Sequence, residues 1–101
     1  MTEKTWEVIF SAKSGKQKTK LPKRMADAFA ALVKDLERLG PEAKKWPNFG
    51  PIYGKAGVFH CHLNKGKPRY VAVWRVNDWE IQIMEVRYVG THEGADYRRI
   101  N

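Results

Sequence analysis

The chain has 101 residues, of which 19 are Lys or Arg and 11 are Asp or Glu, so its formal net charge is +8. Hydrophobic residues make up 43% and aromatic residues 12%, which excludes a disordered chain, and the length predicts a single domain over residues 1–101. Such a basic surplus favours polyanions as partners, although a merely soluble basic protein is the alternative.

The first element expected along the chain is a strand over residues 5–10, because this stretch is rich in aromatic and β-branched residues. Residues 13–20 follow, basic and without an apolar stripe. They fit a short helix or a loop, and we predict a short helix that ends near Leu21 and Pro22.

A longer helix is predicted over residues 23–39. Its apolar residues recur at helical spacing and form one face, namely Met25, Phe29, Leu32, Val33, Leu36 and Leu39. Gly40 and Pro41 end this helix, with Gly just past the last turn. The apolar stripe predicts core packing rather than a ligand surface.

Three strands are predicted after a connector over residues 42–57, at about 58–64, 68–77 and 80–89. A tight turn at Lys65 and Gly66 would join the first two, and a turn around residues 77–79 would join the last two. The order β-α-(α)-β-β-β predicts an α+β fold with a small antiparallel sheet and helices packed on one face.

Alternation along the strand over 58–64 assigns its side chains to two faces. Phe59, Cys61 and Leu63 form the expected core set, which leaves His60 and His62 on an open face. With the tight turn at residues 65–66, His62 would lie opposite Arg69. The residues predicted to share the histidine face are then Arg69, Val71, Val73 and Arg75.

The last strand alternates less cleanly. Glu85 and Arg87 stand where the pattern breaks, which predicts a bulge or a salt-bridged edge. Val89 and Gly90 then turn the chain and place His92 at the strand end. Tyr97 follows in a tail that is expected to be flexible.

These residue types could cleave RNA without a metal or other cofactor. Histidine serves as base or acid near neutral pH, arginine binds a phosphate bidentately, and a tyrosine ring stacks on a base. Two alternatives stay open, solvated polar positions on a strand face and a zinc site formed by the three histidines. Cys61 between two of them is expected to be a buried small residue.

Further basic residues are candidates for contacts to RNA phosphates. They cluster before the long helix and around the predicted turns, and a solvated charged surface is the alternative. The predicted phosphate-binding residues are Lys13, Lys16, Lys18, Lys20, Lys23, Arg24, Lys65, Lys67 and Arg75.

In the order and spacing of these pieces, nearly the whole chain resembles the RelE/ParE superfamily of toxins from toxin–antitoxin pairs, and specifically its ribosome-dependent RNA-cleaving branch. The resemblance implies a RelE-like microbial RNase-type fold and a catalytic set. That set comprises His60, His62, Arg69, His92 and Tyr97. In the column where the family has a phosphate-binding arginine this chain has Val71, and Arg69 lies two residues earlier.

The implied function is cleavage of mRNA on the ribosome by a toxin that a cognate antitoxin neutralises. A ParE-like toxin that poisons DNA gyrase without catalysis is the main alternative, and an inert RNA-binding relative is a third. We predict a cytoplasmic protein without a membrane partner. The chain has a single cysteine and lacks both the apolar core of a signal peptide and an apolar run of transmembrane length. No homo-oligomer is expected without the antitoxin.

Overall fold

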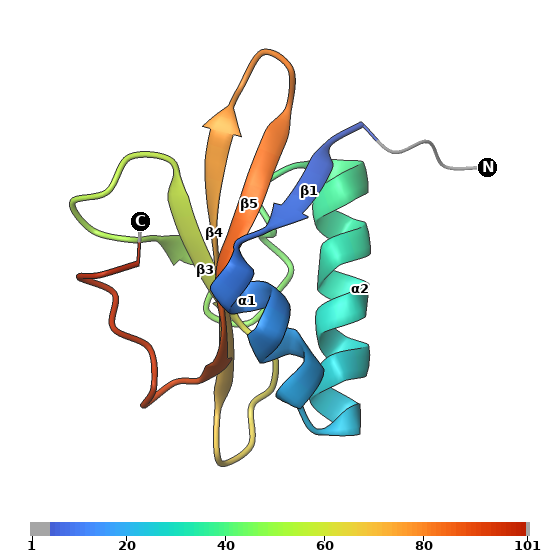
Figure 1. Ribbon diagram of the computed structural model, residues 1–101, viewed down its shortest axis with the longest axis vertical. Coiled ribbons are helices and arrows are strands. Elements are labelled where there is room, and N and C mark those ends of the chain that lie inside the picture. Colours follow the sequence, from blue (N-terminus) through green and yellow to red (C-terminus); the bar gives the residue numbers. More distant parts are fainter. Residues whose placement is uncertain (1–4, 101) are drawn as a thin grey trace.

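The computed structural model describes residues 5–100 (Figure 1). A five-stranded sheet has the spatial order β1-β5-β4-β3-β2. The elements are, in chain order, β1 (Glu7–Phe10), α1 (Ala12–Gln17), a 3₁₀ turn (Lys18–Lys20), α2 (Lys23–Leu39), β2 (Gly50–Pro51), β3 (Val58–His62), β4 (Tyr70–Asp78) and β5 (Ile83–Thr91).

The predicted α+β fold is confirmed, with two differences within the sheet. Strands β3, β4 and β5 form the expected antiparallel meander, but β1 joins β5 in parallel, so the sheet is mixed. The short strand β2, which pairs with β3, was not predicted. Among the described residues, no helix has the length and hydropathy needed to cross a membrane.

Helix α2 has the bounds predicted from its apolar stripe. It buries Phe29, Leu32 and Leu36 against the sheet, in a core that contains the fully buried ring of Trp74. Gly40 ends the helix with a φ of +96°, and its N–H donates to the carbonyl of Leu36. Only glycine adopts that backbone conformation readily, which explains why the helix stops there.

Helix α1 completes the edge of β5 beyond the end of β1. Its N-cap Ser11 accepts a hydrogen bond from the N–H of Ser14, and the buried Ser14 hydroxyl donates to the carbonyl of Val86 at 2.6 Å. Farther along, the N–H of Val89 donates to the side-chain oxygen of Gln17 at 3.0 Å. These contacts hold the basic helix at the sheet edge.

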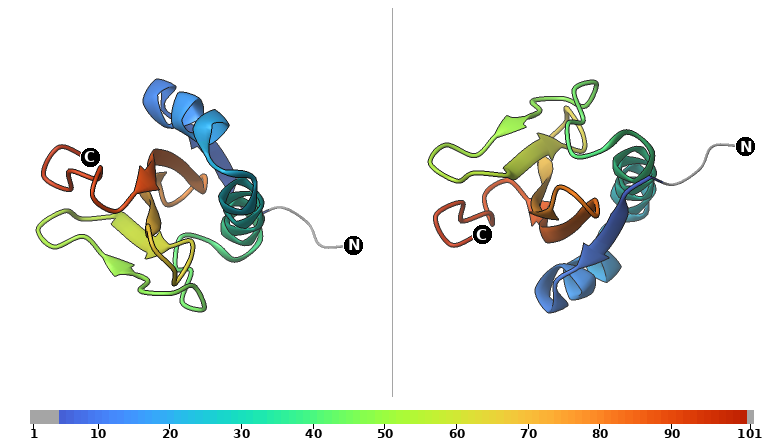
Figure 2. Two further views of the ribbon diagram at one scale, coloured as in Figure 1. Left: turned by 90° about the horizontal axis from the view of Figure 1, so that it is seen from below. Right: turned by 90° about the horizontal axis from the view of Figure 1, so that it is seen from above.

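The face of the sheet opposite α2 is covered as well, so the prediction of an open face is wrong. The chain after β5 folds back across it, and we call residues 93–100 the C-terminal segment (Figure 2). Its residue Ile100 packs with Val58, Val71, Val73 and Tyr88 in a second, smaller core. Burial of this apolar surface holds the segment in place, so the prediction of a flexible tail is also wrong.

The connection between β3 and β4 is longer than the predicted two-residue turn. The Asn64 side chain accepts from the N–H of Tyr70 and donates to the carbonyl of Pro68, which organises a loop over residues 63–69. His62 consequently lies opposite Val71 rather than Arg69. The register differs by two residues, and an even shift keeps every side chain on its predicted face.

Candidate active site

All three histidines and Tyr97 lie together on the face opposite α2. The ring centroids of His60 and His62 are 6.3 Å apart, and those of His62 and His92 are 5.6 Å apart. The Tyr97 ring closes the group, at 5.7 Å from His60 and 6.5 Å from His92. Three separate parts of the chain therefore build one compact cluster, which we call the histidine cluster.

His60 is oriented by the edge strand β2. Its Nδ1 lies 3.0 Å from the carbonyl oxygen of Gly50, which pairs with it in the sheet. Because a carbonyl can only accept, Nδ1 must carry a proton, and in the neutral ring Nε2 is left as an acceptor. This half-buried side chain therefore presents a nitrogen that can take up a proton.

His62 lies on the predicted face but is only 6% exposed, so the prediction that it is exposed is wrong. The backbone N–H of His62 donates to the carbonyl of Pro47, which holds β3 against the connector before β2. Burial lowers the pKa of His62 from 6.5, and the nearby charges of His92, His60 and Arg69 lower it further. His62 is therefore held neutral between two other histidines.

The buried state of His62 predicts a pH dependence of stability. The pKa in the folded protein lies below the ordinary value of 6.5, so the unfolded chain takes up a proton first as the pH falls. The free energy of unfolding should thus decrease as the pH falls through 6.5 toward the lowered pKa. Urea denaturation at pH 7.5, 6.0 and 5.0 measures this decrease, and His62→Asn should make it smaller. An equal decrease in both proteins would contradict the prediction.

His92 follows β5 and is exposed. The backbone N–H of His92 donates to the carbonyl of Arg69 at 2.8 Å, which continues the pairing of β4 with β5 by one residue. This backbone hydrogen bond fixes the position from which the imidazole extends. Just before it, a Cβ at Gly90 would lie 2.8 Å from the hydroxyl of Tyr88. Glycine is therefore the residue that lets Tyr88 pack beneath this turn.

Arg69 is exposed, whereas Val71 is fully buried. Val71 belongs to the second core, so it cannot take the place of a phosphate-binding arginine. The guanidinium of Arg69 lies near enough to His62 to lower the pKa of that histidine. Of these two positions, only Arg69 can offer a cation to a ligand at the histidine cluster.

Tyr97 is held by contacts that the sequence did not reveal. The Nζ of Lys55 donates to the carbonyls of Arg98 and Ile100, at 2.9 and 2.6 Å, and so ties the C-terminal segment to the loop before β3. The Tyr97 hydroxyl is buried without a hydrogen-bond partner among the described residues. Burial, with Tyr88 close by, raises the pKa of Tyr97. Its ring is thus a packed wall of the histidine cluster.

The other predicted basic residues lie in different places. Lys18 covers the ring of Phe10 on the α2 side, with its Nζ 4.1 Å from the ring centroid, and Lys23 pairs with Asp27 at 3.3 Å. Arg75 lies on the histidine face and is exposed. Those that are exposed on α1, on the 3₁₀ turn, at the start of α2 or in the loop after β3 are Lys13, Lys16, Lys20, Arg24, Lys65 and Lys67.

Neither a metal site nor a reactive thiol is found beside the cluster. Over residues 5–100, no three His, Cys, Asp or Glu side chains are arranged to hold a metal ion. Cys61 is buried on the α2 side, and burial raises the pKa of its thiol to about 12. It is a core residue, as predicted.

Comparison with known structures identifies the fold. The chain is similar to the RelE–RelB complex from Pyrococcus horikoshii, with a TM-score of 0.70 and 17% identity over 90% of this chain and 99% of that one. It is also similar to the YoeB dimer from Staphylococcus aureus, with a TM-score of 0.68 and 15% identity over 87% and 98%.

A third similar structure is the RelBE2 toxin–antitoxin complex from Mycobacterium tuberculosis, with a TM-score of 0.63 and 23% identity over 87% and 99%. No protein-family model and no curated protein sequence matches the chain. The chain therefore has the fold of the RelE and YoeB toxins, which confirms the fold expected from the sequence resemblance.

Proposed function

We propose that this protein is a toxin that cleaves mRNA on the ribosome by acid–base catalysis. The single observation that carries the proposal is the histidine cluster, in which three imidazoles and the Tyr97 ring meet beside Arg69. Imidazoles are the side chains best suited to move protons near neutral pH. The net charge of +8 favours the approach of RNA.

The geometry supports a distinct role for each residue. The Nε2 of His60 takes the proton of the ribose 2′-OH, and the 2′ oxygen then attacks the adjacent phosphorus. Arg69 stabilises the negative charge on the phosphate oxygens. His92, which is exposed, donates a proton to the departing 5′ oxygen. The products are a 2′,3′-cyclic phosphate and a 5′-OH, and this route needs no cofactor.

His62 and Tyr97 support this pair in the proposed mechanism. Because His62 is neutral, it adds no positive charge beside its neighbours. Either His60 or His92 can therefore carry a proton without repulsion from His62. The packed ring of Tyr97 contacts both His60 and His92 and limits their movement. Arrangement of the groups before substrate arrives is what makes such catalysis efficient.

The proposed partners are an antitoxin protein, the ribosome and mRNA, in the cytoplasm. Support for an antitoxin comes from two of the similar structures, the RelE–RelB complex and the RelBE2 toxin–antitoxin complex. The predicted single domain and the absence of self-association without the antitoxin are part of the same proposal.

Induction of the gene alone in bacterial cells tests the proposed activity against the gyrase alternative. We expect growth arrest with new 5′ ends in translated transcripts, detected by primer extension, while plasmid supercoiling and chromosomal DNA stay intact. Intact transcripts together with accumulating DNA breaks would favour a ParE-like poison. Intact transcripts and intact DNA would favour an inert RNA-binding relative.

A further inference from the structure

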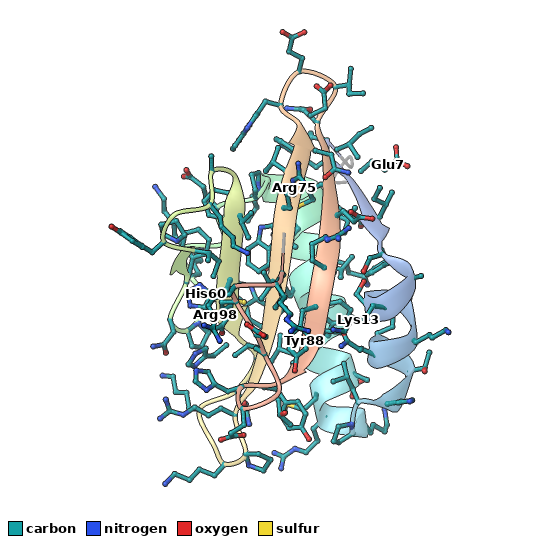
Figure 3. All side chains as sticks on the ribbon, turned by 60° about the vertical axis from the view of Figure 1, so that its left-hand side comes forward. Glu7, Lys13, His60, Arg75, Tyr88 and Arg98 are labelled. Carbon is teal, nitrogen blue, oxygen red and sulfur yellow. The ribbon has the colours of Figure 1, made fainter. Side chains whose placement is uncertain are left out.

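A second group of cations lies on the histidine face, on the other flank of the C-terminal segment. Lys13 and Tyr88 lie on the α1 side of this segment, whereas His60 lies on its β3 side (Figure 3). Between α1, β5 and the segment is a cavity of about 260 Å³. Its basic lining residues are Lys13, Arg87 and Arg99.

Each of the three cations is brought to the cavity by a different element. Lys13 belongs to α1 at the sheet edge and forms no ion pair within residues 5–100. Arg87 is the extra residue where the register of β5 against β4 shifts, so the predicted bulge is confirmed, and Glu85 pairs with it at 2.6 Å. A bulge re-aims a side chain, here toward the cavity.

The charge that lines the cavity is only partly balanced. Arg99 lies 3.6 Å from Asp96, which is the one carboxylate among the lining residues. The remaining lining residues are Ser11, Tyr88, Gly94 and Ile100. Two guanidinium groups and an ammonium around one hollow match the tetrahedral oxygens of a phosphate, since arginine binds such oxygens bidentately.

We propose that this cavity binds a second phosphate of the RNA chain whose scissile phosphate lies at the histidine cluster. The inference rests on the proposed function and adds a site away from the reacting atoms. The C-terminal segment separates the two sites on one continuous face, so a bound strand crosses the segment between them. Phosphate contacts of this kind fix the register of a nucleic acid without reading its sequence.

Two measurements on the whole protein test the site without requiring cleavage. Inorganic phosphate should shift the backbone amide NMR signals of Ser11 and Gly94, which line the cavity. Lys13→Gln with Arg99→Gln should abolish those shifts. The matched control, Arg38→Gln with Lys45→Gln, removes the same charge from exposed residues outside the cavity and should keep them. Phosphate that moves neither amide signal in the unchanged protein would overturn the site.

The second measurement is the salt dependence of binding to a single-stranded DNA oligonucleotide, which lacks the 2′-OH and is not cut. Each lost phosphate contact lowers the log–log salt slope by about 0.7 for single strands, so the cavity variant, which loses one phosphate contact, should lose about 0.7. The control variant should lose less. An equal slope in both would overturn the assignment to a nucleic acid chain and leave a free phosphate compound as the occupant.

The two proposals fail in different ways. His92→Ala should leave the phosphate shifts of the cavity amides unchanged, because His92 is not part of the cavity lining. If the unchanged protein binds phosphate in the cavity but cuts no RNA, the proposed cleavage is wrong and the cavity stands. If it cuts RNA but phosphate moves no cavity signal, the cavity inference alone is wrong.

Discussion

His92→Ala is expected to lower the rate of mRNA cleavage about 100- to 10,000-fold, because loss of one positioned acid has that effect. The imidazole is exposed, and its place is fixed by the backbone hydrogen bond from His92 to Arg69, which alanine retains. The folded state should therefore change little. Growth arrest on induction should disappear at equal protein level, while the midpoint of thermal unfolding stays close to that of the unchanged protein.

The matched control for this change is Glu93→Ala, at the neighbouring exposed position outside the histidine cluster. It removes a side chain from the same turn and should leave cleavage and growth arrest intact. A His92→Ala protein that still arrests growth and cuts transcripts at an undiminished rate would exclude His92 as the acid. The cluster would then need another proton donor.

Substitution of His60 and of His62 by asparagine should have unequal effects. In His60→Asn the new side-chain amide would keep a donor to the carbonyl of Gly50 but would lack the basic Nε2, so cleavage should fall at least about 100-fold. His62 is buried and neutral, and His62→Asn should lower cleavage less than about tenfold, with its larger effect on stability.

Single-turnover cleavage of mRNA on purified ribosomes measures this inequality, with urea denaturation of both variants as the control for folding. A larger loss of cleavage in His62→Asn than in His60→Asn would assign the base to His62. Equal losses larger than about 100-fold in both would mean that the two imidazoles act as one unit.

The sequence could predict which side chains lie on each face of the sheet, because a register error of two residues leaves every side chain on the same face. Phe59 and Cys61 pack beneath α2, and His60 and His62 lie on the other face, although the loop after β3 is longer than predicted. The length of that loop depends on two hydrogen bonds of the Asn64 side chain, which donates to the carbonyl of Pro68 and accepts from the N–H of Tyr70. Turn propensity alone gives no signal for such a contact.

The covering of the histidine face could not be predicted, for a related reason. Residues 93–100 contain few apolar side chains and no helical or strand periodicity, so they read as a solvated tail. Their position depends on long-range contacts, namely the packing of Ile100 into the second core and the hydrogen bonds from Lys55. These contacts determine the burial of Tyr97.

The candidate site residues were predicted from side-chain chemistry and from the resemblance, and the structure brings four of the five into ring contact. What the sequence could not show is how they are oriented. The carbonyl of Gly50 selects the tautomer of His60, and burial keeps His62 neutral. Both effects arise from backbone and packing, which no residue pattern encodes locally.

Cleavage of a ribosome-bound mRNA that carries one 2′-deoxynucleotide tests the central claim most directly. If the histidine cluster activates the ribose 2′-OH, the all-ribose message should be cut to a 2′,3′-cyclic phosphate and a 5′-OH. The message with 2′-deoxyribose at the cut position should stay intact at that position. Equal cutting of both messages, or products that end in a 5′-phosphate, would contradict the proposed mechanism.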